Sequence, residues 1–164
     1  MSSSSTPNLQ VRLQPPSIPP SFTPPLSLTI HLTIHNPSTT TPTTLLNWGS
    51  PLDPKAGILG VFEVRDVETN EPVLLDEIKF GRKLPPARED FVEIPAGGEV
   101  TAEVTIPRAP LEQGKRYTIR AKGWWQAVWE SALGDVPEGD LDRLTGALRG
   151  DFESEQVPIE IGQA

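Results

Sequence analysis

The chain has 164 residues, enough for one domain with an ordinary hydrophobic core, and 19 of them are prolines, which favour loops and extended segments. It contains no cysteine, which excludes disulfides, thiol nucleophiles and thiolate zinc sites. The formal net charge is -8, and no cluster of Lys and Arg is present that could bind a phosphate backbone, so we expect no nucleic-acid partner.

The sequence shows no apolar run long enough to cross a bilayer, no cleavable signal segment and no usable glycosylation sequon. We therefore expect no membrane partner and a cytoplasmic location. The alternative is a secreted protein whose signal segment is absent from this sequence.

The N-terminal part is predicted to be extended. Residues 1–7 offer little apolar surface to bury and are expected to form a disordered tail, followed by a single domain over 8–164. A first strand is predicted over 8–13. The proline-rich residues 15–25 are predicted to be a stiff connector rather than a ligand for an SH3-type domain, because no basic residue stands at the usual flanking position.

Residues 26–35, "LSLTIHLTIH", alternate strictly between apolar and polar side chains, which predicts a half-buried strand. On a strand, His31 and His35 would lie roughly 13 Å apart, at about 3.3 Å per residue, which is too far to share one zinc ion. The zinc-protease helix motif also needs Glu after its first His, and here Leu32 follows His31. The sequence therefore predicts no metal site and no cofactor.

Further short strands follow at regular intervals, separated by turn signals. They are predicted over 43–48, 60–66, 73–80, 90–106 (two strands joined by a turn at Gly97–Gly98), 115–129 (one or two strands) and 155–161. This succession, without alternating helices, predicts an all-β fold: an antiparallel β-sandwich of seven to nine strands.

One segment departs from this pattern. Residues 138–150 place Leu141, Leu144 and Leu148 at helical spacing, with acidic residues in the first turn and Gly150 as a stop. We predict a short amphipathic helix inserted before the last strand. It would cover an open end or face of the sandwich, or alternatively bind a partner.

Several stretches within residues 27–121 together resemble the N-terminal pro-domain of fungal deuterolysin-type (aspzincin) metalloproteases. They are "TIHNPS", "LLNWGSPLDP", "GVFEVRD", "IKFGRKLPPAREDFVEIPAGGEV" and "RYTIR". The resemblance implies an immunoglobulin-like fold and a fungal origin. The protease domain, with its paired-His helix and Asp ligand, is missing, so no peptidase activity is implied.

No catalytic motif was recognised, and the best functional candidates are tryptophans. In residues 123–129, "GWWQAVW", Trp125 and Trp129 are predicted to share one strand face, with Trp124 on the other. At least one would then point outward, as a binding patch or covered by the leucines of the insert. A second candidate is the loop 47–57, with Trp48 and Asp53, read either as a structural turn or as a recognition loop.

These observations support two functional hypotheses. The first is a non-catalytic interaction module that binds a protein partner, such as a protease or a client. The alternative is a small-molecule-binding protein or an atypical enzyme, with a pocket between the sandwich and the helical insert.

Overall fold

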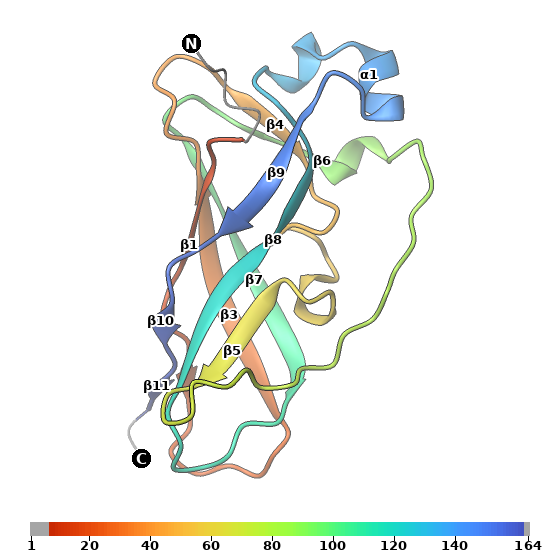
Figure 1. The fold of residues 1–164 in the computed structure, drawn as a ribbon. Coiled ribbons are helices and arrows are strands. Elements are labelled where there is room, and N and C mark those ends of the chain that lie inside the picture. Colours follow the sequence, from red (N-terminus) through yellow and green to blue (C-terminus); the bar gives the residue numbers. More distant parts are fainter. Residues whose placement is uncertain (1–6, 163–164) are drawn as a thin grey trace.

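The computed structural model describes residues 7–162, which form two facing β-sheets (Figure 1). The first sheet has three antiparallel strands in the order β1 (Gln10–Leu13), β3 (Leu26–His35) and β7 (Glu99–Ala109). The second is centred on β8 (Tyr117–Trp129), which pairs with β4 (Thr43–Leu46), β5 (Phe62–Asp66), β9 (Leu148–Glu153) and β10 (Val157–Pro158). The strand β6 (Phe91–Ile94) extends this sheet beyond β4.

Two short strands, β2 (Ser17–Ile18) and β11 (Glu160–Ile161), pair in parallel beside the sheets. The helical elements are η1 (Ala56–Ile58), η2 (Arg88–Asp90), η3 (Leu133–Asp135) and α1 (Glu138–Arg143). Eight of the strands in residues 7–162 have four or more residues. The predicted all-β sandwich of seven to nine strands is therefore confirmed.

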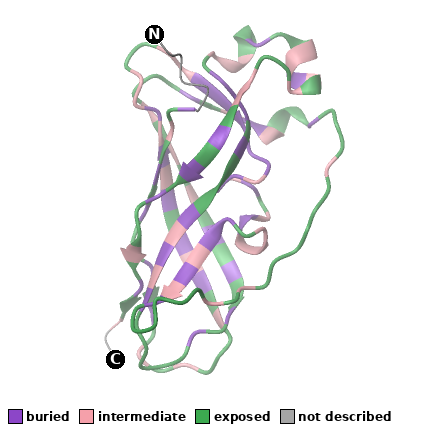
Figure 2. Ribbon diagram, in the orientation of Figure 1, coloured by how far each residue is buried: buried purple, intermediate pink, exposed green. Residues whose placement is uncertain are grey.

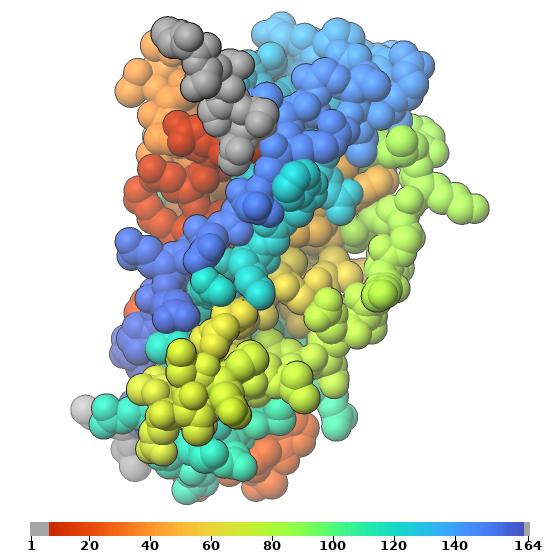
Figure 3. Space-filling view, viewed as in Figure 1, coloured from red at the N-terminus to blue at the C-terminus, as the bar shows by residue number. Residues whose placement is uncertain are grey.

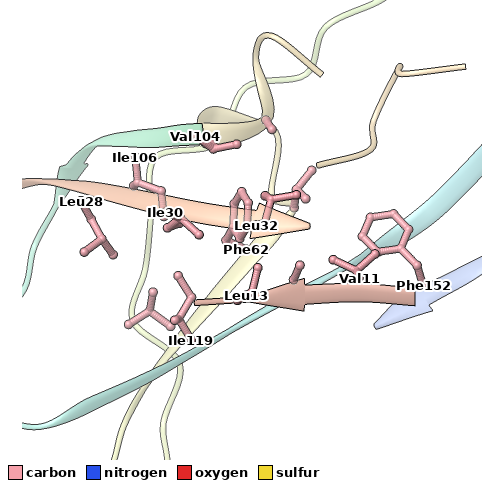
Figure 4. Packing of buried hydrophobic residues seen from close by; sticks show 14 of the residues in the cluster. Val11, Leu13, Leu28, Ile30, Leu32, Phe62, Val104, Ile106, Ile119 and Phe152 are labelled. Atoms are coloured by element: carbon pink, nitrogen blue, oxygen red, sulfur yellow. The ribbon is translucent and has the colours of Figure 1, made fainter. Parts of the chain in front are cut away.

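The main core lies between the two sheets. Four of the five apolar positions of β3 are buried and the fifth, Leu26, is partly buried, which confirms the strand predicted over 26–35 with its bounds. They meet apolar side chains from β1, β5, β7 and β8, and Phe152 of β9 closes one side of this cluster (Figure 4). His31 lies on the opposite, exposed face of β3, with its Nδ1 atom 3.8 Å from a carboxylate oxygen of Glu103.

One predicted strand is absent from the structure: residues 73–80 are the start of a long irregular segment. The Gly97–Gly98 turn joins two strands as predicted, and β6 and β7 belong to different sheets and do not pair with each other. The stretch 115–129 holds a single strand, β8, of 13 residues.

The predicted helix over 138–150 is also shorter than expected. It ends at Arg143, Leu144 adopts a left-handed conformation with φ of 56°, and Leu148 and Gly150 already belong to β9. The stop comes early because Thr145 donates both its N–H and its hydroxyl to Asp140, and Gly146 continues the turn with a positive φ.

Of the two predictions for the N-terminal part, the tail and the connector, the structure describes the second in full and the first at one residue. Of the predicted tail over 1–7, residues 1–6 lie outside the described residues, and Pro7 is buried. The predicted connector over 15–25 is irregular except for β2, which holds it against β11.

Candidate interaction surface

The four tryptophans lie in three different environments. Trp125 is 1% exposed in the main core, with its ring centroid 4.6 Å from that of Phe152. Trp129 is buried in a second, smaller cluster. The prediction that Trp125 and Trp129 share a strand face is wrong, because the register of β8 against β9 shifts between Trp125 and Val128.

The helical insert packs on this second cluster. The cluster contains Trp48, Trp129 and Leu141 as buried members, and Leu144 packs against it partly buried. The indole N–H of Trp129 donates to the Thr145 carbonyl at 3.0 Å, which ties the end of the insert to β8. The leucines therefore cover Trp129 but not Trp125, while Leu148 is half-buried in β9. Apolar side chains fill the space where a pocket was expected.

Trp124 is the tryptophan that reaches the surface, with half of its side chain exposed. It points away from the core on β8, with Lys122 and Gln126 two residues to either side, and Asp151 is its partner on β9. A shallow hollow of about 390 Å³ lies against it, lined by Gly60, Lys122, Gly123, Trp124, Asp151, Phe152 and Glu153. Of the eight side chains predicted to form a site, Trp124 is the most accessible to a ligand.

Asp53 organises the loop that follows β4. Its carboxylate accepts hydrogen bonds from the backbone N–H groups of Gly49 at 2.8 Å and Lys55 at 2.9 Å, which fixes two successive turns. Trp48 is 7% exposed, and its indole N–H donates to Asp90 at 3.0 Å. These contacts favour the first of the two interpretations of the loop 47–57, a structural turn, over a recognition loop.

The charge of Asp53 is matched by Arg82, which reaches it from a distant part of the chain. The guanidinium donates to both carboxylate oxygens at 2.7 Å, and the Asp53 side chain is fully buried. Burial alone would raise the pKa of Asp53, but the hydrogen bonds from Arg82, Lys55 and Gly49 together lower it below its ordinary value. Arg82 also lies over the ring of Phe80, 4.8 Å from its centroid.

Arg82 belongs to an irregular segment over residues 73–87, which we call the strap. It runs along one side of the molecule from β5 to η2, and Figure 2 shows that most of its length is exposed. Hydrogen bonds from Val73 N–H to the Val64 carbonyl and from Ile78 N–H to the Ile58 carbonyl hold its first half in place. Four large apolar side chains on it are exposed: Leu74 (87%), Ile78 (42%), Phe80 (47%) and Leu84 (50%).

The first part of the strap is connected to Trp124 by two adjoining hollows, and Figure 3 shows the side of the molecule along which the strap runs. A second hollow, of about 320 Å³, includes Leu74 and Glu77 of the strap, and it shares Gly60 and Lys122 with the hollow beside Trp124. We call the strap, Lys122 and Trp124 together the strap surface.

A charged cluster stabilises the sheet side of this surface. The carboxylate of Glu63 lies 2.9 Å from Lys122, 2.8 Å from Arg65 and 3.1 Å from Arg120. The hydrogen bond from Lys122, with those of its neighbours, lowers the pKa of Glu63 to about 2 despite partial burial. Lys122 is thus held beside Trp124.

The sequence reasoning missed the strap by reading its first half as a strand. The signal against a strand was present: Leu74 and Leu75 are adjacent, and Pro85 and Pro86 follow soon after.

Within residues 7–162 no group of three or more His, Asp or Glu side chains is placed to hold a metal ion. The helices of this described part are all too short or too polar to cross a membrane.

Comparison with known proteins identifies the domain. A protein of Arthroderma benhamiae with the name "Uncharacterized secreted protein" is 46% identical over 127 residues, which make up 76% of this chain and 64% of that protein. The chain thus spans less than two thirds of this relative's length. A family model for an immunoglobulin-like domain matches residues 8–161, which include every strand of both sheets. The chain therefore belongs to the immunoglobulin-like domain family.

Proposed function

We propose that this protein is a non-catalytic interaction module that binds a protein partner through the strap surface. One observation carries the proposal: four large apolar side chains of the strap stay exposed, and the first part of the strap shares a hollow with Lys122, two residues before the half-exposed Trp124. Exposed apolar groups that lie together on a folded domain mark interaction sites, and tryptophan is among the commonest residues at their energetic centres.

The conformation of the strap supports this proposal. The ion pair between Arg82 and the buried carboxylate of Asp53 and the backbone bond from Ile78 to Ile58 fix the strap at two points. The exposed side chains are therefore presented in a fixed arrangement, and binding needs little ordering of the free protein.

The packing of the insert does not support the alternative, a small-molecule site between the sandwich and the insert. The buried side chains of Trp129 and Leu141 occupy that space. The buried carboxylate of Asp53 and the carboxylate of Glu63, whose pKa is lowered to about 2, are each engaged by structural partners.

We infer that the protein acts outside the cell. The support is the name of the Arthroderma benhamiae relative, which describes that protein as secreted. This favours the secreted alternative over the cytoplasmic location expected from the sequence.

The resemblance to deuterolysin pro-domains suggests a first partner to test. Neither the family match nor the relative addresses that resemblance, so a secreted zinc peptidase of this type remains a candidate partner only. Binding to a purified deuterolysin-type catalytic domain, and inhibition of its peptidase activity, would be measured directly.

Site-specific photo-crosslinking tests the interaction function. A benzophenone amino acid is placed at Trp124 or Leu84 on the strap surface, and as a control at Glu103, an exposed residue on the other sheet. The variants are mixed with fungal culture proteins and with the purified peptidase. The proposal expects the same partner to be captured from 124 and 84 but not from 103, and Trp124→Ala to weaken its binding by at least about tenfold. Equal capture from all three positions, or none from 84 and 124, would contradict it.

A further inference from the structure

The second half of the strap and the first residue of η2 form a basic stretch in an acidic chain. Residues 78–88 contain four basic residues and no acidic one, whereas the whole chain carries -8. Arg82 is neutralised by Asp53, and Arg88 lies 3.3 Å from Glu138 and 3.2 Å from Asp142. The ion pairs formed within residues 7–162 do not include Lys79 or Lys83, and both lysines are exposed. Two cations are therefore available to a partner.

Phe80 lies at the centre of this basic stretch. Its ring is 4.8 Å from the Lys55 ammonium and 4.8 Å from the Arg82 guanidinium, measured to the ring centroid. Both distances are within the range of cation–π attraction, so two cations hold the ring while 47% of the residue stays exposed. An apolar side chain that packs on Phe80 would place its neighbours close to positive charge.

The backbone of the same stretch is open. Within the described part of the chain, no hydrogen bond involves the N–H or C=O groups of residues 79–84. A Cβ atom built on Gly81 would meet no other atom within 4 Å, so nothing covers the strap there. Unpaired main-chain groups of this kind are what an extended peptide uses when it pairs with a receptor backbone.

We propose that residues 79–84 bind an extended, acidic segment of the protein partner, with an apolar side chain of that segment packed on Phe80. Carboxylates of the segment would face Lys79 and Lys83, and its backbone would pair with that of the strap. This rests on the interaction function proposed above and names the chemistry of the partner.

The charge pattern favours a narrow peptide over an anionic membrane. Acidic residues border the basic stretch on both sides, with Asp76 and Glu77 before it and Glu89 and Asp90 after it. The nearby helix α1 adds Glu138 and Asp142. A broad anionic surface would meet these carboxylates together with the lysines, whereas an extended peptide can contact residues 79–84 alone.

Selection from a random 12-residue peptide display library tests the proposal on the whole protein. The enriched peptides should combine Asp or Glu with large apolar residues. A synthetic copy of the most enriched peptide should bind at least about fivefold more weakly to K79Q/K83Q than to the unaltered protein, and more weakly in high salt. F80A should also weaken it. The matched control R12Q/R116Q removes two exposed cations elsewhere and should change nothing.

Three outcomes would overturn the proposal: enriched peptides without acidic residues, binding that is indifferent to K79Q/K83Q, or no peptide that depends on the strap. Strap-dependent binding to phosphatidylserine vesicles, and not to peptides, would assign the surface to lipid instead. If a partner is still crosslinked at position 84 of K79Q/K83Q with undiminished yield, the acidic-segment proposal fails while the interaction function stands. Absence of any crosslinked partner removes the interaction function itself.

Discussion

The helical insert around α1 and the strap both carry large apolar side chains outside the two sheets, yet these side chains lie in opposite environments. Leu141 of the insert is 4% exposed against Trp129, whereas Leu84 of the strap is 50% exposed. The insert meets an apolar surface at the end of β8. The strap is instead held by the ion pair between Arg82 and buried Asp53 and by backbone bonds to β5 and η1. An apolar segment is therefore buried only where its anchoring contacts allow it to reach apolar surface.

The ion pair that fixes the strap should give the largest effect. Arg82→Met leaves the fully buried carboxylate of Asp53 without its cation, and we expect a loss of about 3–5 kcal/mol in the free energy of unfolding. Urea denaturation measures this loss. Adding Asp53→Asn to the variant should recover part of it, because the uncompensated charge is removed. A loss below about 1 kcal/mol would show that the strap is held by other contacts.

The same substitution in both regions sharpens the comparison. Leu141→Ala should cost about 2–5 kcal/mol and shift tryptophan emission to the red, because water reaches Trp129. Leu84→Ala should leave the free energy of unfolding within about 0.5 kcal/mol of the unaltered protein. Denaturation and emission spectra of the two variants, taken side by side, test this. Equal costs would mean that the strap is packed like the insert.

The charged cluster under the strap surface predicts a pH effect. The pKa of Glu63 is lowered from 4.5 to about 2 in the folded protein, so its contribution to stability is present above about pH 4.5 and is lost as the pH falls towards 2. Glu63→Gln should therefore lower stability at pH 7 by about 1–2 kcal/mol.

The comparison with the unaltered protein at each pH isolates this effect, because Asp53 and Asp66 also have lowered pKa values and weaken both proteins in acid. The difference between the two proteins should shrink between pH 4.5 and pH 2. A difference that stays constant across this range would contradict the role given to Glu63.

Trp124 should give the smallest effect on stability. Since half of this side chain is exposed, Trp124→Ala should change the free energy of unfolding by no more than about 0.5 kcal/mol. The emission spectrum should lose its long-wavelength component, because the other three tryptophans are buried. A large destabilisation would show that Trp124 supports the fold rather than a binding surface.

Much of the fold could be predicted from short-range patterns. The alternation in 26–35 gave β3 with its bounds, since one buried face needs a period of two. The same reasoning failed in β8, where a bulge moves Val128 to the core side and Trp129 to the second cluster. A bulge cannot be recognised from the sequence period, so the prediction that Trp125 and Trp129 share one strand face was wrong.

The candidate surface could be predicted only in part. Trp124 was a candidate from the start, but its exposure depends on what neighbouring strands leave uncovered. The strap was missed because its conformation depends on a contact between Arg82 and Asp53, 29 residues apart, that no local pattern encodes. The helix over 138–150 was overextended because a leucine stripe outweighed Thr145 and Gly146, which end it.

Amide hydrogen exchange of the unaltered protein tests most directly whether the strap, and not the insert, is the open surface. We predict rapid exchange at residues 79–84, whose N–H groups lack partners among the described residues. We predict slower exchange at Asp140, Leu141 and Thr145 of the insert, which donate to carbonyls of Pro137 and Asp140. Equal protection of residues 79–84 and of the insert would be the opposite result, because the strap would then be a packed element with no free backbone to offer a partner.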